Sequence, residues 1–146
     1  MLVNDNIKDI ETEDSIFKKI KVKKSYAGLG LYADEDIKKG EKIIEYIGLI
    51  FLGKEANEVK TNMYLFEVSK NKTINGSVRW NKARYINHSC EGNAESEIRQ
   101  GRVYIVATKN IRKGEEITYD YGEEFFNEYI GKECRCPAKK HKYSAK

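Results

Sequence analysis

The sequence predicts a mainly β protein with only short helices. Its apolar residues come in short stretches rich in Ile, Val, Tyr and Phe, a composition typical of strands. These stretches are Lys42–Phe51, Met63–Val68, Val103–Thr108 and Ile117–Tyr121. Gln100-Gly101 has the composition of a hairpin turn between Glu95–Arg99 and Arg102–Thr108. Only Gly53–Thr61 has a helical composition.

An internal repeat supports this β architecture. Residues 33–43 match residues 107–117 at a constant offset of 74, and six of the eleven positions are identical. Each copy places Lys-Gly-Glu just before an apolar strand, so we expect Gly40 and Gly114 to occupy a turn position with positive φ. A common turn type would explain this match, and so would a pseudo-symmetric fold with two related β-units.

The composition fits one folded domain. The 146 residues have room for one core, and 40% hydrophobic residues with ten tyrosines exclude wholesale disorder. No segment approaches the roughly 18 consecutive apolar residues of a membrane helix, and the polar, acidic start lacks the pattern of a secretory signal. Three cysteines fit reduced thiols or a metal site better than disulfides. We therefore expect an intracellular protein without membrane contact.

Two segments in the first two thirds of the chain suit a binding site. Ala27-Gly28-Leu29-Gly30 lets the backbone approach a ligand closely, although a hairpin turn would look the same. No helical pattern follows it, which disfavours a dinucleotide fold. The run Asn87-His88-Ser89-Cys90 is unusual in a purely structural strand. Ser89 lacks the Gly-x-Ser-x-Gly surroundings of a hydrolase nucleophile, so serine hydrolysis is a poor interpretation.

A pair of tyrosines marks a third segment. Tyr119 and Tyr121 lie two residues apart on an expected strand, so their side chains point to one face and Asp120 points to the other. Such a pair forms one wall of an aromatic pocket suited to a cation or an alkyl-ammonium chain. Taken alone, however, this segment is explained better by core packing.

Metal-type ligands gather near the C-terminus. Cys134, Cys136 and His141 supply three zinc-type ligands within eight residues, while a structural zinc site needs four. The remaining cysteine of the chain is Cys90. An incidental Cys-x-Cys in a basic tail is the alternative. The positive charge of this tail permits contact with nucleic acid, but a solvated basic tail explains it more simply.

Together and in this order, the segments resemble the SET-domain family of protein lysine methyltransferases, over about Ile20 to His141. The most specific motifs are Arg-Tyr-Ile-Asn-His-Ser-Cys, which starts at Arg84, and Gly-Glu-Glu-Ile-Thr-Tyr-Asp-Tyr-Gly, which starts at Gly114. The resemblance implies a SET-domain β-clip fold with a pseudoknot, in which the Asn-His and Tyr-x-Tyr segments thread past one another. It also implies transfer of a methyl group from S-adenosylmethionine to a lysine of another protein.

The resemblance assigns a cofactor site residue by residue. It implies that S-adenosylmethionine is bound by Ala27, Gly28, Leu29, Gly30, Tyr64, Asn87, His88 and Phe126. Within this set, the Ala27–Gly30 segment takes the methionine and ribose end, and Tyr64 borders the same pocket. Asn87 and the backbone of His88 hold the adenine, and Phe126 packs against the adenine ring.

The resemblance also implies a catalytic tyrosine and a zinc site. Tyr121 corresponds to the catalytic tyrosine, with Tyr46 and Tyr119 lining the lysine channel. The four ligands of a structural post-SET zinc site correspond to Cys90, Cys134, Cys136 and His141. His141 stands where the family usually has a cysteine, and a Cys₃His site is chemically normal for zinc. The family's cysteine-rich pre-SET region has no counterpart here.

These implications define the expected organisation and function. We expect a leader over residues 1–16, a SET domain over 17–126 and a post-SET-like zinc-binding tail over 127–146. The expected activity is mainly monomethylation of a histone or another basic chromosomal protein, which would place the protein at the nucleus or chromosome. One alternative is a catalytically silent SET fold that binds lysine-bearing peptides. Another is a zinc-stabilised module that binds nucleic acid through its basic tail.

Overall fold

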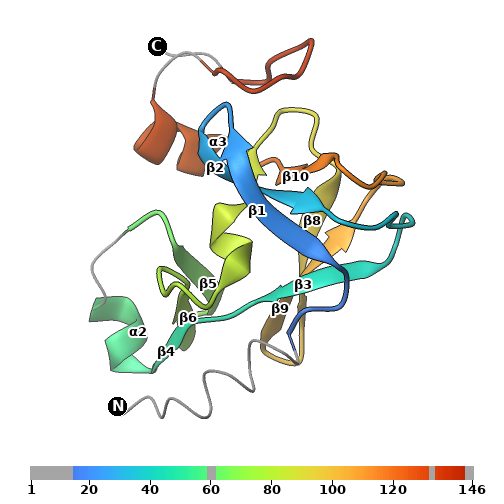
Figure 1. The fold of residues 1–146 in the computed structure, drawn as a ribbon. Coiled ribbons are helices and arrows are strands. Elements are labelled where there is room, and N and C mark those ends of the chain that lie inside the picture. Colours follow the sequence, from blue (N-terminus) through green and yellow to red (C-terminus); the bar gives the residue numbers. More distant parts are fainter. Residues whose placement is uncertain (1–14, 59–61, 132–133, 144–146) are drawn as a thin grey trace.

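Three small β-sheets build the protein, as the computed structural model shows for residues 15–58, 62–131 and 134–143 (Figure 1). The four-stranded sheet has the order β1 (Ile20–Ser25), β2 (Gly28–Ala33), β10 (Glu116–Tyr119) and β7 (Asn87–His88). One three-stranded sheet has the order β3 (Lys42–Tyr46), β9 (Arg102–Ala107) and β8 (Ala94–Arg99). The other has the order β4 (Leu49–Leu52), β6 (Lys72–Asn75) and β5 (Leu65–Ser69).

The helical segments are short and lie at the edges of these sheets. They are α2 (Lys54–Glu58), the 3₁₀ turn η1 (Lys82–Tyr85), α3 (Glu123–Phe125) and the π-helical turn η2 (Phe126–Ile130). In Figure 1, α2 lies beside β4 and β6, while α3 follows β10 at the opposite end of the molecule. The expectation of a mainly β protein with short helices is confirmed. No helix among the described residues is long and apolar enough to cross a membrane.

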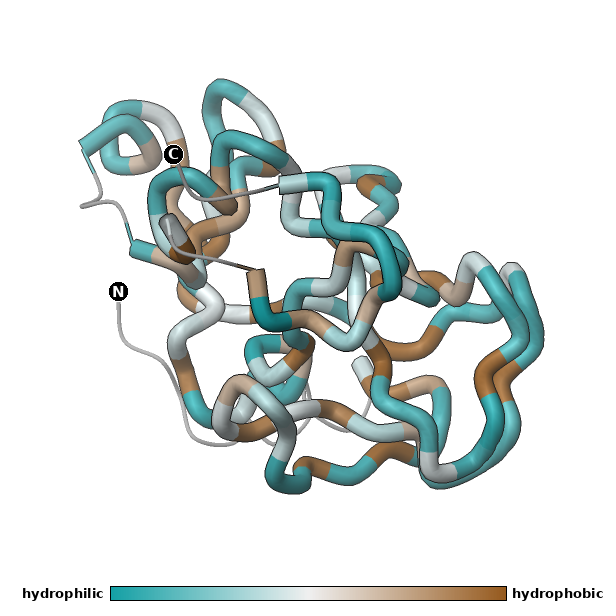
Figure 2. Tube along the Cα trace, turned by 90° about the horizontal axis from the view of Figure 1, so that it is seen from above, coloured by the Kyte–Doolittle hydropathy of each residue, from teal (hydrophilic) through white to brown (hydrophobic). Residues whose placement is uncertain are grey.

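The core joins the first two sheets. Leu31 of β2, Ile43 of β3, Val103 and Ile105 of β9 and Ile117 of β10 are fully buried in one cluster. Because β9 lies in the centre of its sheet, it carries the apolar run Val103–Ala107 instead of a strict alternation. In Figure 2, the outlying turns are largely hydrophilic by contrast.

The sequence repeat corresponds to a pseudo-twofold arrangement. Ile37 and Ile111 exchange two backbone hydrogen bonds of 2.8 Å with each other. Gly40 N–H donates to the carbonyl of Ala107, and Gly114 N–H donates to that of Ala33, which is the equivalent bond with the two copies of the repeat exchanged. Both glycines have positive φ, 91° and 93°, as predicted. The pseudo-symmetric fold is therefore confirmed, and a shared turn type alone does not account for these reciprocal bonds.

The predicted elements agree with the structure except at their ends. Lys42–Phe51 is divided into β3 and β4, because strand pairing is interrupted at Ile47-Gly48. Gly48 packs so closely that any side chain there would overlap the backbone of Asn75. The turn at Gln100-Gly101 has two positive φ values, 51° and 75°, as a two-residue hairpin requires. The expected helix Gly53–Thr61 is observed as α2, and its last residues lie outside the described part of the chain.

Several elements were not predicted, and β6, η1 and β7 are among them. The β1–β2 hairpin was also missed; its turn is Tyr26-Ala27, and the Gly-x-Gly segment starts β2. The helical stretch formed by α3 and η2 was not predicted either. Of the expected leader, residues 1–14 lie outside the described residues, whereas Ile16 forms a bridge with Ile44 of β3.

Candidate active site and metal centre

Parallel pairing of two short strands brings the two most specific motifs together. In the register of β7 and β10, Asn87 faces Thr118 and His88 faces Tyr119. The backbone N–H of Ser89 continues this ladder to the carbonyl of Tyr119 at 3.1 Å. The strands that thread past one another in the expected fold therefore lie side by side, and Tyr121 follows directly after them.

A cavity of about 390 Å³ opens beside this pairing. Its size suits a ligand of cofactor dimensions. Three expected cofactor residues line it, namely Ala27, Asn87 and His88, together with Tyr121. The remaining lining residues were not predicted as cofactor ligands, and they are Tyr26, Met63, Ile130, Cys134, Arg135 and Cys136.

Tyr26 is the most informative of the lining residues that sequence reasoning missed. Its hydroxyl donates a hydrogen bond to the main-chain carbonyl of His88, across the cavity wall. Burial is the main cause that raises the pKa of Tyr26, so the hydroxyl remains a donor. A tyrosine directly before the Ala27-Gly28-Leu29-Gly30 segment was the available signal. Strand β1, which ends directly before Tyr26, was not predicted either.

The two glycines of the Gly-x-Gly segment have different roles. Gly28 has a φ of 97° and open space around it, so the turn conformation requires it. Gly30 has an ordinary φ, but a Cβ atom there would lie 2.6 Å from the Glu116 carboxylate. Neither glycine, nor Leu29, is among the residues that line the cavity.

Two further expected cofactor residues lie outside the cavity lining. The ring of Tyr64 is covered by the guanidinium of Arg84, whose central carbon is 4.6 Å from the ring centroid. Phe126 is fully buried in an apolar cluster with the three cysteines, where its ring centroid is 5.7 Å from that of His88. The structure therefore places Phe126 in the core of the tail, since η2 packs onto the cysteine segment.

Two of the three expected channel tyrosines have rings in contact with each other. The Tyr119 and Tyr121 ring centroids are 4.9 Å apart, and the Tyr121 hydroxyl donates to the carbonyl of Ile86. Burial raises the pKa of Tyr119 to about 12 and that of Tyr121 well above its ordinary range. Tyr46 is also buried, and its hydroxyl donates to the carbonyl of Tyr64 at 2.7 Å. These hydroxyls therefore stay protonated at neutral pH.

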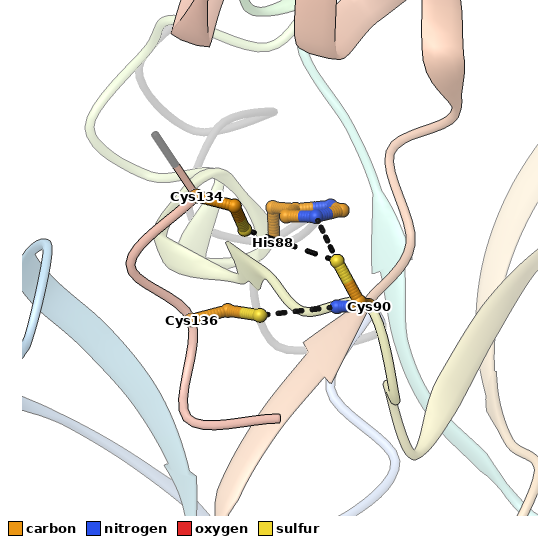
Figure 3. A group of neighbouring side chains, drawn as sticks. All are labelled: His88, Cys90, Cys134 and Cys136. Carbon is orange, nitrogen blue, oxygen red and sulfur yellow. Dashed lines mark hydrogen bonds between the residues drawn. The ribbon is translucent and has the colours of Figure 1, made fainter. Parts of the chain in front are cut away.

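Four potential metal ligands converge at the base of the tail. One ligand atom from each of His88, Cys90, Cys134 and Cys136 lies within 4.8 Å of the others, and all four residues are buried. In Figure 3 the two tail cysteines reach inward from the C-terminal segment, toward Cys90 and His88. His141 also approaches this group, with Nδ1 3.3 Å from the sulfur of Cys136 and 3.9 Å from that of Cys90.

The distances in this cluster fit a tetrahedral zinc site. Zinc bonds of about 2.3 Å to sulfur and about 2.0 Å to nitrogen give ligand separations of about 3.8 Å and about 3.5 Å. The sulfur atoms of Cys90 and Cys134 are 3.8 Å apart. The two tail thiols differ: burial raises the pKa of Cys134 to about 12, whereas backbone N–H donors from Cys90 and Ala138 outweigh burial and lower the pKa of Cys136 to about 7. A Cys₃His ligand set is therefore available.

Two histidines compete for the fourth position, and their hydrogen bonds distinguish them. Burial lowers the pKa of His88, so its ring is neutral at pH 7. Its Nδ1 accepts the backbone N–H of Tyr121 at 3.1 Å, so the ring proton sits on Nε2. That Nε2–H points at the sulfur of Cys90 at 3.5 Å, as a donor. His88 therefore supports a ligand, and His141 is the better fourth ligand.

The tail is tied to the tyrosine segment by Asp120. Its carboxylate accepts hydrogen bonds from the backbone of Gly122 at 2.9 Å, from Lys142 at 3.1 Å and from the Tyr143 hydroxyl at 3.1 Å. Burial opposes its ionisation, but these donors lower the pKa of Asp120. Asp120 therefore contacts the tail, whereas the rings of Tyr119 and Tyr121 contact each other.

The comparisons with known sequences agree with the motifs. A family model of the SET domain matches residues 28–122. Histone-lysine N-methyltransferase ASHH3 of Arabidopsis thaliana is 38% identical over 134 residues, which cover 83% of this chain and 36% of that protein. Histone-lysine N-methyltransferase 2D of Homo sapiens is 36% identical over 122 residues, which cover 76% of this chain and 2% of that protein.

Solved structures show the same fold. The crystal structure of Chaetomium thermophilum polycomb repressive complex 2 has a TM-score of 0.64 at 31% identity, over 75% of this chain and 16% of that one. A ctPRC2 structure in an autoinhibited conformation bound to S-adenosylmethionine has a TM-score of 0.61 at 31% identity, over 72% and 15%. The chain thus spans 36% or less of the length of each of these proteins. The expected fold class is confirmed, and the chain belongs to the SET domain family.

Proposed function

We propose that this protein is an S-adenosylmethionine-dependent protein-lysine N-methyltransferase. The observation that carries the proposal is the position of Tyr121, which lines the cavity beside Asn87 and His88. A tyrosine at the wall of a cofactor-sized cavity, next to a second aromatic ring, suits the side chain of an incoming lysine. The family and the activity named for its relatives point the same way.

The tyrosines are suited to align a lysine amine. S-adenosylmethionine supplies a methyl group that passes from its sulfonium to a neutral amine. A free lysine has a pKa of about 10.4, and an apolar, buried channel lowers it. The Tyr121 hydroxyl donates its hydrogen bond to the Ile86 carbonyl, so its oxygen lone pairs can accept a hydrogen bond from the amine. Its raised pKa makes it an orienting group and not a base, and alignment supplies the rate enhancement.

The cofactor site proposed for the chain is centred on β7. Asn87 and the main chain of His88 contact the cofactor directly, and the segment Ala27–Gly30, which runs from the hairpin turn into β2, borders it at Ala27. Tyr64 and Phe126 do not contact the cofactor in this proposal; they pack against residues that surround the site. This assignment is supported by the cavity lining for Ala27, Asn87 and His88. For Phe126 it is supported by the ring contact with His88.

The proposed metal is a structural zinc ion held by Cys90, Cys134, Cys136 and His141. Its chemistry there is to hold the tail in place, since all four coordination positions would be filled by protein. Cys134 and Cys136 lie both in the ligand cluster and in the cavity wall. The tail, proposed over residues 127–146, would therefore complete the site that residues 17–126 begin.

The proposed substrate is a histone or another basic chromosomal protein, and the proposed product is mainly monomethyl-lysine. The first part is supported by relatives that are named histone-lysine methyltransferases, which also suggests a nuclear or chromosomal location. The second part is supported by Tyr119, two residues before Tyr121, with its ring 4.9 Å away. A hydroxyl at this place holds the amine or a water molecule and leaves little room for a second methyl group.

A methyl-transfer assay tests the proposal. The full chain, loaded with zinc, is incubated with methyl-labelled S-adenosylmethionine and purified core histones, and label is counted in each protein band. Label in a histone supports the proposal, and label that appears only in other basic proteins corrects the substrate. Binding of S-adenosylhomocysteine without any transfer would favour a catalytically silent fold that only binds lysine-bearing peptides. Salt-dependent DNA binding independent of cofactor would favour the nucleic-acid module.

A further inference from the structure

Glu116 is a part-buried carboxylate that does not line the cavity, yet it contacts a residue that does. It begins β10 and faces Tyr32 of β2 in the antiparallel register. Its Oε1 accepts hydrogen bonds from the hydroxyls of Ser25 at 2.6 Å and Tyr32 at 3.2 Å. Its Oε2 accepts a hydrogen bond from the side-chain amide of Asn87 at 2.9 Å. One carboxylate thus connects β1 and β2 to the cavity residue of β7.

The amide of Asn87 has one orientation that suits its neighbours. The same amide group that meets Glu116 also lies 2.9 Å from the main-chain oxygen of Leu29. Both neighbours are acceptors only, so the amide atom that faces them is the nitrogen, and both of its hydrogens are used. The amide oxygen has no hydrogen-bond partner among the described residues, and Asn87 lines the cavity. Asn87 therefore presents a hydrogen-bond acceptor, its amide oxygen, to the cavity, and not a donor.

Gly30 gives an independent sign that this contact is built into the fold. A Cβ atom at this position would lie 2.6 Å from Oε2 of Glu116 and 2.9 Å from the Cβ atom of Ser25. Gly30 is buried and has no positive φ, so the backbone conformation does not require glycine there. The missing side chain instead leaves the space through which the Glu116 carboxylate reaches Asn87.

We propose that Glu116 is a positioning residue that fixes the Asn87 amide, so that its oxygen accepts a hydrogen bond from an N–H donor of the cofactor. This inference rests on the proposed use of S-adenosylmethionine. Two cofactor groups have the required chemistry, the ammonium of the methionine part and the amino group of the adenine. Without the Glu116 carboxylate, a flipped amide would present its own N–H groups to either donor and repel it.

Calorimetry on the full, zinc-loaded chain tests the role through the Kd of S-adenosylhomocysteine. Glu116→Met removes both acceptor oxygens at similar size, and we expect the Kd to rise about tenfold, the equivalent of one hydrogen bond. Glu116→Gln keeps an oxygen that can accept from Asn87, so its Kd should stay near that of the wild type. Glu115→Met is the matched control, because Glu115 is exposed and its carboxylate meets only the Arg112 backbone among the described residues.

A double variant separates positioning from a general loss of structure. If Glu116 acts through Asn87, Asn87→Ala combined with Glu116→Met should bind no more weakly than Asn87→Ala alone. The ligand 5′-methylthioadenosine distinguishes the two donors, because it keeps the adenine and lacks the ammonium. Unchanged binding of this ligand in Glu116→Met assigns the ammonium, and a similar tenfold loss assigns the adenine amino group.

Three results would overturn the proposal: additive losses in the double variant, a Glu116→Gln variant as weak as Glu116→Met, or a folded Glu116→Met variant with wild-type affinity. If Glu116→Met does not fold, Gly30→Ala displaces the same carboxylate and takes its place. Hydrogen exchange of the Asn87 side-chain amide gives a readout without cofactor, and it should be slow in the wild type and fast in Glu116→Met. A wild-type chain that shows this protection but binds no S-adenosylhomocysteine would contradict the proposed function and leave the positioning role standing.

Discussion

The zinc site gives the sharpest quantitative prediction, because two histidines approach the same three cysteines. His141 Nδ1 is 3.3 Å and 3.9 Å from the sulfur atoms of Cys136 and Cys90, close to the separation of about 3.5 Å expected for zinc ligands. His88 is 3.5 Å from Cys90 but donates its only ring proton toward that sulfur. Distance alone does not separate the two histidines, whereas the direction of the hydrogen bond does.

The perturbation is therefore a pair of single substitutions. His141→Ala removes one of four ligands, and we expect zinc affinity to fall more than 100-fold. His88→Gln keeps an N–H donor at similar reach but offers zinc no imidazole, so we expect a loss within the roughly 10–100-fold range of outer-shell partners. The assay is competition for zinc with a colorimetric chelator at pH 7.5. Zinc affinity should also decrease as the pH falls, because protons compete with the metal for the cysteine thiolates.

The reverse order of the two losses would refute the hydrogen-bond argument. Zinc affinity that falls further in His88→Gln than in His141→Ala would make His88 the ligand and His141 a bystander. Unchanged affinity in both variants would show that a ligand outside these five residues fills the site. Circular dichroism of each variant before and after chelation separates loss of metal from loss of fold.

Three further predictions concern the tyrosine segment and its supports. Tyr119→Phe should shift the product from monomethyl- toward di- and trimethyl-lysine without loss of the first transfer, as read by peptide mass spectrometry. Gly76→Ala should reduce turnover several-fold and lower the melting temperature, because its Cβ atom would overlap the ring of Tyr46; unchanged activity would mean that Tyr46 tolerates displacement. Asp120→Asn should lower the free energy of unfolding by about 1 kcal/mol at pH 7. Because the pKa of Asp120 is lowered in the folded state, this difference should start to decrease near pH 3.8 and vanish only below the lower, folded-state pKa.

The sequence allowed the local features of the fold to be predicted. Turn rules that act within a few residues predict the positive φ of both Lys-Gly-Glu turns and the hairpin at Gln100-Gly101. The same holds for the common face of Tyr119 and Tyr121, which strand alternation determines. The motif segments were also identified, because unusual residue types lie next to one another in the chain.

The contacts that complete the site depend on long-range packing, and the sequence alone did not reveal them. Glu116 and Asn87 are separated by 29 residues, and nothing in the spacing indicates that they meet. Phe126 was expected at the adenine, whereas its burial beside the cysteines follows from how η2 packs. Tyr26 was missed because the β1–β2 hairpin, whose turn contains it, was not predicted. In each of these cases a non-local contact decides which way a side chain points.

Transfer of a methyl group by Tyr121 variants tests the central claim most directly. Wild type and Tyr121→Phe, both zinc-loaded and both shown to bind S-adenosylhomocysteine, are incubated with S-adenosylmethionine and a histone peptide, and the peptide is sequenced by mass spectrometry. We predict a monomethylated lysine with the wild type and at least 100-fold slower turnover with Tyr121→Phe, since the orienting hydroxyl is lost. Equal turnover of the two proteins, or no lysine methylation by a wild type that binds the cofactor, would contradict the account.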